Sequence, residues 1–151
     1  MRIEEKLAAL GHRLPQLPVP GGNYLPARRV GSLLFLSGVV SSAAGSVVTG
    51  TVGADRSVED GYAAARLCAL TQLAVVAEVL GSLDLVEGVV SVNGYVNAVA
   101  GFGDPPAVIN GASDLLVALY GERGRHVRAA VGVSALPRNA LVELQMLVEV
   151  R

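Results

Sequence analysis

The residues best suited to chemistry lie in one short segment, Arg125-His126-Val127-Arg128. A guanidinium is planar and permanently charged, so Arg128 could donate two parallel hydrogen bonds to a carboxylate. His126 could move protons near neutral pH, because an imidazole titrates in that range. Residues two apart on a β-strand share a face, so we expect His126 beside Arg128. The structural alternatives are a salt bridge from Arg128, with Glu143 as its partner, and a solvated His126 in a turn.

Metal and cofactor chemistry have little support in this sequence. The chain holds two histidines, His12 and His126, and a single cysteine, Cys68, so a zinc site would have to recruit carboxylates. It contains no Walker loop, no GxGxxG, no HExxH and no paired CxxC. Cys68 falls in a predicted apolar helix, where a packing role is expected. We therefore predict no metal and no cofactor.

Composition narrows the class of protein. A chain of 151 residues is long enough for one domain. Its formal net charge of −1, from 12 basic and 13 acidic groups, favours neither nucleic acid nor a membrane surface as partner. The lone cysteine favours a reducing compartment, and two early acids argue against a secretory signal, so we expect a cytoplasmic protein. A mean hydropathy of +0.51 predicts that some apolar surface meets another subunit.

Periodicity predicts an α+β fold. An N-terminal helix and a proline-rich stretch form an extension over residues 1–21, and the domain proper occupies residues 22–151. Within the domain, spacings of three and four predict helices, and alternating or valine-rich runs predict strands. The predicted segments are strands at 28–30 and 33–37, a helix at 57–80, a strand at 86–98, a helix at 105–120 and strands at 127–134 and 141–150. This β-β-α-β-α-β-β order indicates a sheet with both helices on one face.

The last two strands predict which sheet face carries the helices. In the final strand Val142, Leu144, Met146 and Val148 share one face, and Glu143, Gln145 and Glu149 share the other. In the strand before it, Val127, Ala129, Val131 and Val133 alternate with Arg128, Ala130, Gly132 and Ser134. We expect the aliphatic faces of both strands to carry the helices.

Several short motifs, weak singly but specific in their order, resemble the RidA family, also called YjgF or L-PSP. The resemblance spans Gly22 to Val150 and includes an arginine nine residues before Pro137. The residues that carry it are, in order, Gly22-Asn23-Tyr24, Ser37-Gly38, Asn110, Arg128, Leu136-Pro137 and the closing strand around Glu143 and Gln145. The N-terminal extension is typical of a divergent side branch. The resemblance implies a chorismate-mutase-like fold and a homotrimer with ligand clefts between subunits.

The resemblance also implies an activity: hydrolysis of reactive enamine and imine acids to 2-keto acids and ammonia. It places Arg128 at the substrate carboxylate, Tyr24 and Ser37 at positions that orient the substrate or a water, and Asn110 at the cleft. The family's deaminases carry a glutamate on the last strand that acts on the attacking water, and we assign that position to Gln145. The family glutamine after Ser-Gly is Val39 here, and the cysteine two residues after the arginine is Ala130.

Because Gln145 can bind a water but cannot take its proton, deaminase activity is expected to be weakened, with His126 as a candidate substitute for the missing acid. The alternative is a non-catalytic trimer that binds a small carboxylate. Ribonuclease activity or translation inhibition ranks third, because the chain is net acidic and has no aromatic platform for bases.

Overall fold

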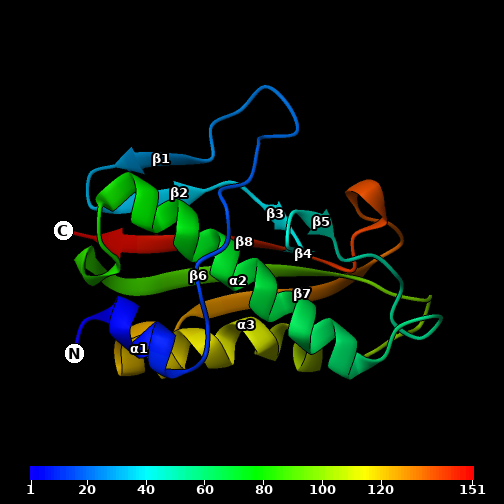
Figure 1. Cartoon of the computed structure of the whole chain (residues 1–151). Coiled ribbons are helices and arrows are strands. Elements are labelled where there is room, and N and C mark those ends of the chain that lie inside the picture. The colour runs from blue at the N-terminus through cyan, green and yellow to red at the C-terminus, as the bar shows by residue number, and fades with distance from the viewer.

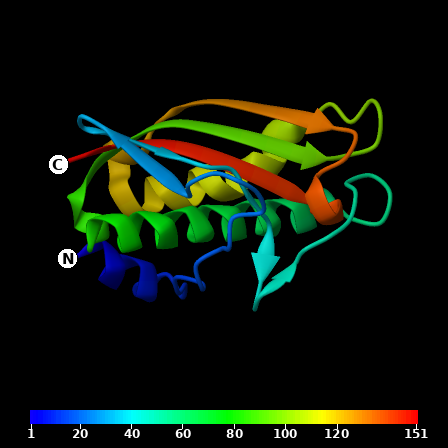
Figure 2. The ribbon, with the colours of Figure 1, turned by 90° about the horizontal axis from the view of Figure 1, so that it is seen from above.

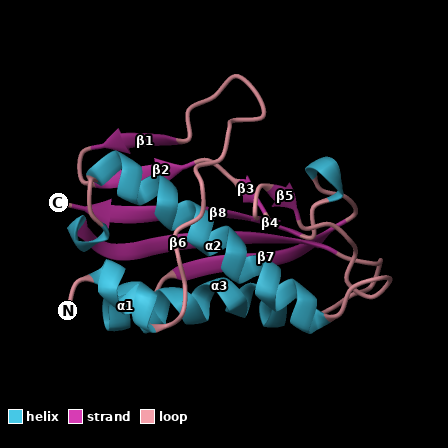
Figure 3. Cartoon of the chain, in the orientation of Figure 1, coloured by secondary structure: helices cyan, strands magenta, loops and turns pink.

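A computed structural model describes residues 1–151 as an α+β structure (Figures 1 and 3). Its helices are α1 (Ile3–Ala9), α2 (Val58–Leu80) and α3 (Pro105–Tyr120), with short 3-10 turns at Leu83–Leu85, Gly121–Gly124 and Pro137–Asn139. Its strands are β1 (Ala27–Val30), β2 (Leu33–Leu36), β3 (Val39–Val40), β4 (Ser42–Ala43), β5 (Ser46–Val47), β6 (Val86–Asn97), β7 (Val127–Val133) and β8 (Val142–Val150). The predicted order of the main elements is therefore confirmed.

Capping interactions explain where both long helices begin and where α2 ends. The Ser57 hydroxyl accepts a hydrogen bond from the amide of Asp60, whose side chain accepts one from the Ser57 amide, so α2 opens with a capping box. Asp104 caps α3 by accepting from the amide of Ala107. Gly81, with φ of 86°, ends α2 in the left-handed conformation that glycine adopts without strain.

The main sheet has the strand order β1-β2-β8-β6-β7, with β3 also paired to β8. β6 and β7 run parallel, and the other pairs are antiparallel. Both α2 and α3 cover the same face of this sheet, as Figure 2 shows, and the opposite face carries no helix. β7 forms one edge, and the β2–β3 connection at Ser37-Gly38 lies on the other side of β8 and β6. These two places hold the candidate site residues.

The core lies between the helices and the sheet and is built from aliphatic side chains. Leu144 and Met146 of β8 and Val92 of β6 are at most 1% exposed, as predicted for the aliphatic face of β8. Cys68 of α2 is fully buried, and burial raises the pKa of its thiol, so the predicted packing role is confirmed. By length and composition α2 could cross a membrane, but 61% of its most apolar window is buried inside this domain.

The N-terminal helix α1 packs onto the domain. Ile3 and Leu7 are buried in the core, and the Ile3 amide donates to Asp84 at 2.8 Å. The carboxylate of Glu4 accepts from the amide of Leu83 at 2.7 Å, which caps the 3-10 turn before β6. α1 therefore stabilises the start of the central strand.

On β7 the predicted orientation is wrong. Arg128, Ala130 and Gly132 face α3, whereas Val127 and Val131 lie on the helix-free face and are 71% and 45% exposed. α3 runs close beneath this edge strand and leaves little space between them. The β7 residues that face α3 are therefore two small ones and an arginine, whose long flexible side chain can reach out of the gap. The aliphatic side chains of β7 are left without a covering element in the single chain.

Candidate functional site

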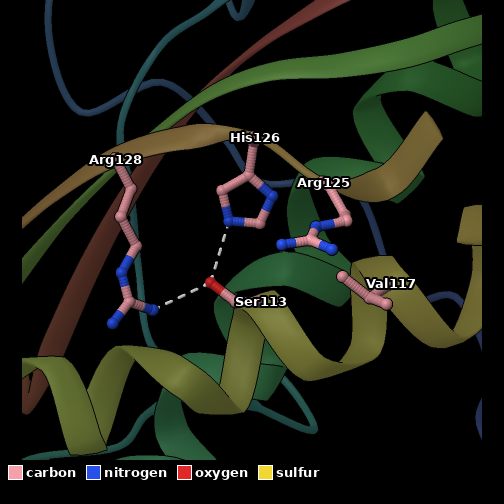
Figure 4. A pocket seen from close by; sticks show the side chains of 5 residues that line it. All are labelled: Ser113, Val117, Arg125, His126 and Arg128. Atoms are coloured by element: carbon pink, nitrogen blue, oxygen red, sulfur yellow. Dashed lines mark hydrogen bonds between the residues drawn. The ribbon is translucent and has the colours of Figure 1, made fainter. Parts of the chain in front are cut away.

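Arg128 lies at the open edge of the sheet, above α3 (Figure 4). Its Nη1 donates to the hydroxyl of Ser113 at 2.9 Å, and its Nη2 donates to the carbonyl of Pro106 at 3.2 Å. A guanidinium has five N–H groups, so three remain for a ligand. Arg128 forms no salt bridge, and the predicted alternative partner Glu143 lies on the opposite sheet face. The arginine is thus held in place while it keeps its capacity for an anion.

His126 lies beside Arg128, as the strand spacing predicted. Its Nε2 is 2.9 Å from the Ser113 hydroxyl, and its Nδ1 is 2.7 Å from the carbonyl of Gly124. A carbonyl can only accept, so Nδ1 carries a proton and Nε2 of the neutral ring accepts from Ser113. Ser113, which sequence reasoning did not assign to the site, joins the two predicted residues. No local pattern identifies it, because 15 residues separate it from Arg128 along the chain.

Asn110 extends this group along α3. Pro106, Asn110, Ser113 and Val117 recur at spacings of four and three, so they form one stripe on the side of α3 that faces the β7 edge. Asn110 is exposed on that stripe. We call Asn110, Ser113, His126 and Arg128 the edge group.

Tyr24 and Ser37 belong to a second group on the other side of the sheet. Ser37 follows β2, and its hydroxyl donates to the carbonyl of Leu25 while its amide donates to Pro26. The loop that carries Tyr24 is therefore attached to Ser37. The Tyr24 ring is 48% exposed, and its hydroxyl accepts from the amide of Gly21 at 3.0 Å.

Glu143 of β8, named in the sequence analysis only within the closing-strand motif and as a partner for Arg128, is a second candidate site residue that the sequence did not assign. A Cβ added to Gly38 would lie 2.8 Å from Glu143 Oε2, so this carboxylate lies directly against the Ser37-Gly38 turn. Partial burial raises the pKa of Glu143 above its usual value, because it disfavours the charged carboxylate. The available signal was the alternation of β8, which places Glu143 and Gln145 on one face.

Gln145 lies two residues further along β8, exposed and opposite Asn93 of β6. We call Tyr24, Ser37, Glu143 and Gln145 the face group: β8 presents Glu143 and Gln145 on the helix-free face, and the turn at Ser37, to which the Tyr24 loop is attached, lies against Glu143. Arg128 pairs with Val92, whose side chain points into the helix-covered core, whereas Glu143 pairs with Tyr95 on the opposite face. The structure therefore assembles two separate groups and does not join them within one chain.

Cavities favour the edge group as a ligand site. A cavity of about 240 Å³ is lined by Ser113, Val117, Arg125, His126 and Arg128. A larger hollow of about 500 Å³ lies between the ends of β6 and β7 and the loop at Thr51, and its lining holds no titratable side chain. No three His, Cys, Asp or Glu side chains lie close enough to share a metal ion.

Comparison with known proteins places this arrangement in a family. The family described as "YjgF/chorismate_mutase-like, putative endoribonuclease" matches residues 4–150, which include all of α1 but its first residue, and both groups. The chain belongs to the YjgF/RidA family. The resemblance based on a few motifs is thereby confirmed, and so is the α+β, chorismate-mutase-like fold.

Several known proteins are similar to this chain along almost its whole length. Protein TCP17 of Trypanosoma cruzi is 42% identical over 150 residues, covering 98% of this chain and 94% of the relative. A crystal structure of a protein with unknown function from Agrobacterium tumefaciens is 43% identical, with a TM-score of 0.91 and coverage of 99% and 94%. A "putative endoribonuclease" from Shewanella oneidensis is 34% identical, with a TM-score of 0.95 and coverage of 99% and 100%.

Proposed function

We propose that this protein hydrolyses small imino and enamino acids to 2-keto acids and ammonia. Arg128 carries the proposal: it lies at an open sheet edge, oriented by Ser113 and Pro106, with three N–H groups left for a carboxylate. A bidentate guanidinium–carboxylate pair would fix both the position and the plane of a small substrate. Asn110 lies on the same side of α3, where it would contact the substrate or the neighbouring subunit.

Glu143 supplies the acid–base chemistry in this proposal. Its carboxylate takes a proton from water as the water oxygen bonds to the imine carbon, and the imine nitrogen gains a proton. That proton comes from Glu143, which then carries the hydroxyl proton of the resulting carbinolamine to its amino group; the carbon–nitrogen bond breaks, nitrogen leaves as ammonia and a keto group forms. Tyr24 and Ser37 orient the substrate, and the Gln145 amide holds the water. With Glu143 present on this strand, the chemistry does not depend on Gln145 as a base or on His126 as its substitute.

The two groups require a second copy of the chain to meet. We propose a homotrimer in which the edge group of one subunit faces the face group of its neighbour, with the ligand cleft between them. Exposed apolar side chains on the helix-free face, among them Phe35, Val127 and Val131, support this arrangement, because such a surface is suited to an interface. The proposal thereby explains the high mean hydropathy of so small a chain.

Turnover of a matched substrate tests this function. We would generate 2-aminoacrylate and related imino acids in situ and measure the release of keto acid and ammonia, with wild type and Arg128→Ala at equal protein concentration. We expect acceleration by the wild type and a loss of at least about a hundredfold in kcat/KM for the variant, because two charge-assisted hydrogen bonds disappear. The matched control is Arg13→Gln, which removes an exposed arginine outside both groups.

A second outcome separates the alternatives. If no imino acid is turned over, while small carboxylates bind the wild type and not Arg128→Ala, the protein is a carboxylate-binding trimer without chemistry. The description of the family and of the Shewanella oneidensis protein points to endoribonuclease activity as another candidate. Cleavage of RNA that depends on His126 and weakens steeply with salt would support that activity over ours.

A further inference from the structure

The cavity beside Arg128 has a charge that one carboxylate does not neutralise. Arg125, His126 and Arg128 line it together with Ser113 and Val117, and no carboxylate is among the lining residues. Figure 4 shows Arg125 and Arg128 on either side of the His126 ring, with the Ser113 hydroxyl between the helix and the strand. A substrate carboxylate on Arg128 would leave the guanidinium of Arg125 with only a solvent-exposed ion pair to Glu122.

Arg125 is available to a ligand. Its one ion pair is with Glu122 at 3.7 Å, and the two side chains are 71% and 89% exposed. Pairs this exposed contribute little and exchange readily with other partners. Val117, 40% exposed beneath Arg125, adds an apolar patch on which the methylene chain of a ligand could lie.

Ser113 holds the side chains of the cavity in place by hydrogen bonds. With a neutral imidazole the Ser113 hydroxyl donates to His126 Nε2. The Ser113 oxygen accepts from Arg128 Nη1 at 2.9 Å, so one hydroxyl contacts both the imidazole and the guanidinium. The two cationic side chains and the imidazole are therefore held around one cavity by α3 and the start of β7.

We propose that this cavity is a subsite for a second negative group, so that the substrate class is imino acids whose side chain ends in a carboxylate. The reaction in this inference rests on the proposed function. The subsite does not, because it requires only that the ligand binds. The α-carboxylate binds Arg128, and the terminal carboxylate binds between Arg125 and His126. Hydrolysis then yields a 2-oxo dicarboxylic acid and ammonia, with water as the other reactant.

Binding of two product-like acids tests the subsite without any turnover. 2-Oxoglutarate and 2-oxopentanoate have the same five-carbon chain and differ in the terminal carboxylate. By calorimetry we expect wild type to bind 2-oxoglutarate at least about tenfold more tightly, since one charge-assisted interaction is gained. In Arg125→Gln that ratio should fall to about one, and in Arg13→Gln it should stay at the wild-type value. Equal affinities in wild type, or an unchanged ratio in Arg125→Gln, would overturn the subsite.

A parallel turnover assay separates this inference from the proposed function. Oxidation of glutamate and of norvaline by amino-acid oxidases supplies the corresponding imino acids. A binding preference that depends on Arg125, with no turnover of either imine, would retain the subsite and reject the deaminase. Equal turnover of both imines by wild type and Arg125→Gln would retain the deaminase and reject the subsite.

Discussion

Arg128 and Glu143 lie on opposite faces of one β-sheet, Arg128 beside Val92 over α3 and Glu143 opposite Tyr95 on the face without a helix. A carboxylate anchor and an acid–base group that serve one small substrate must lie within a few ångströms of it. The sheet prevents this within a single chain. The proposed activity therefore belongs to an assembly, and the predictions below test each part of that relationship.

Val131→Lys should dissociate the assembly. Val131 is 45% exposed on the helix-free face, where a charge would have to be buried between subunits. Light scattering should give three times 15.5 kDa for wild type and a single 15.5 kDa chain for the variant, with imine turnover lost at equal concentration. Val79→Lys changes a similarly exposed valine on α2 and should remain a trimer. A monomeric wild type that is fully active would contradict the shared cleft.

Glu143→Gln should lower the activity without lowering the stability at neutral pH. Loss of the acid–base group should lower kcat by about a hundredfold or more. Burial raises the pKa of Glu143, so the folded state prefers the protonated carboxyl; this contribution to stability is present at low pH and is lost as the pH rises through the raised pKa.

The uncharged variant should therefore be at least as stable as wild type at pH 7, and the advantage should disappear near pH 4. Thermal unfolding across pH 4–8 measures this, beside a pH–rate profile. In wild type, turnover should fall at acidic pH as Glu143 is protonated. Wild-type turnover in Glu143→Gln would assign the base elsewhere.

Gly38→Ala should displace the carboxylate without harming the fold. The new Cβ would lie 2.8 Å from Glu143 Oε2, which must move, while Gly38 has no left-handed backbone that would strain an alanine. We expect kcat to fall by about tenfold to a hundredfold, as displaced catalytic groups do, with an unchanged Tm. Gly103→Ala, where the added Cβ has no close neighbour, is the control. Unchanged kinetics would show that the position of Glu143 at this turn is not critical.

Gln72→Met should destabilise the fold around Ser37. The buried Gln72 amide donates to the carbonyls of Ser37 at 2.8 Å and Leu144 at 3.1 Å, joining α2 to the point where β2 gives way to β3. Methionine has similar bulk but leaves both carbonyls without their donor, at a cost of about 1–3 kcal/mol in the free energy of unfolding. Urea unfolding measures the loss, with the exposed Gln16→Met as control. An equal midpoint for Gln72→Met and wild type would contradict this role.

The sequence by itself determined the features that depend on near neighbours. Ser57 and Asp104 predicted the helix starts, the alternation in β8 predicted its buried face, and the spacing of His126 and Arg128 predicted that they lie together. Each depends on contacts within a turn of helix or two residues of strand, which backbone geometry alone specifies.

Only the tertiary structure decided which face of β7 meets α3, that Ser113 joins His126 to Arg128, and that Glu143 lies against Gly38. Alternation predicts two faces for a strand but does not say which one a helix will cover. At the edge strand β7, the face that α3 covers depends on how closely α3 approaches. Because the approach is close, the face with small residues and one flexible arginine packs against α3, and the face with valines does not. Contacts between residues far apart in the chain have no local signature, because they exist only once the helices pack on the sheet.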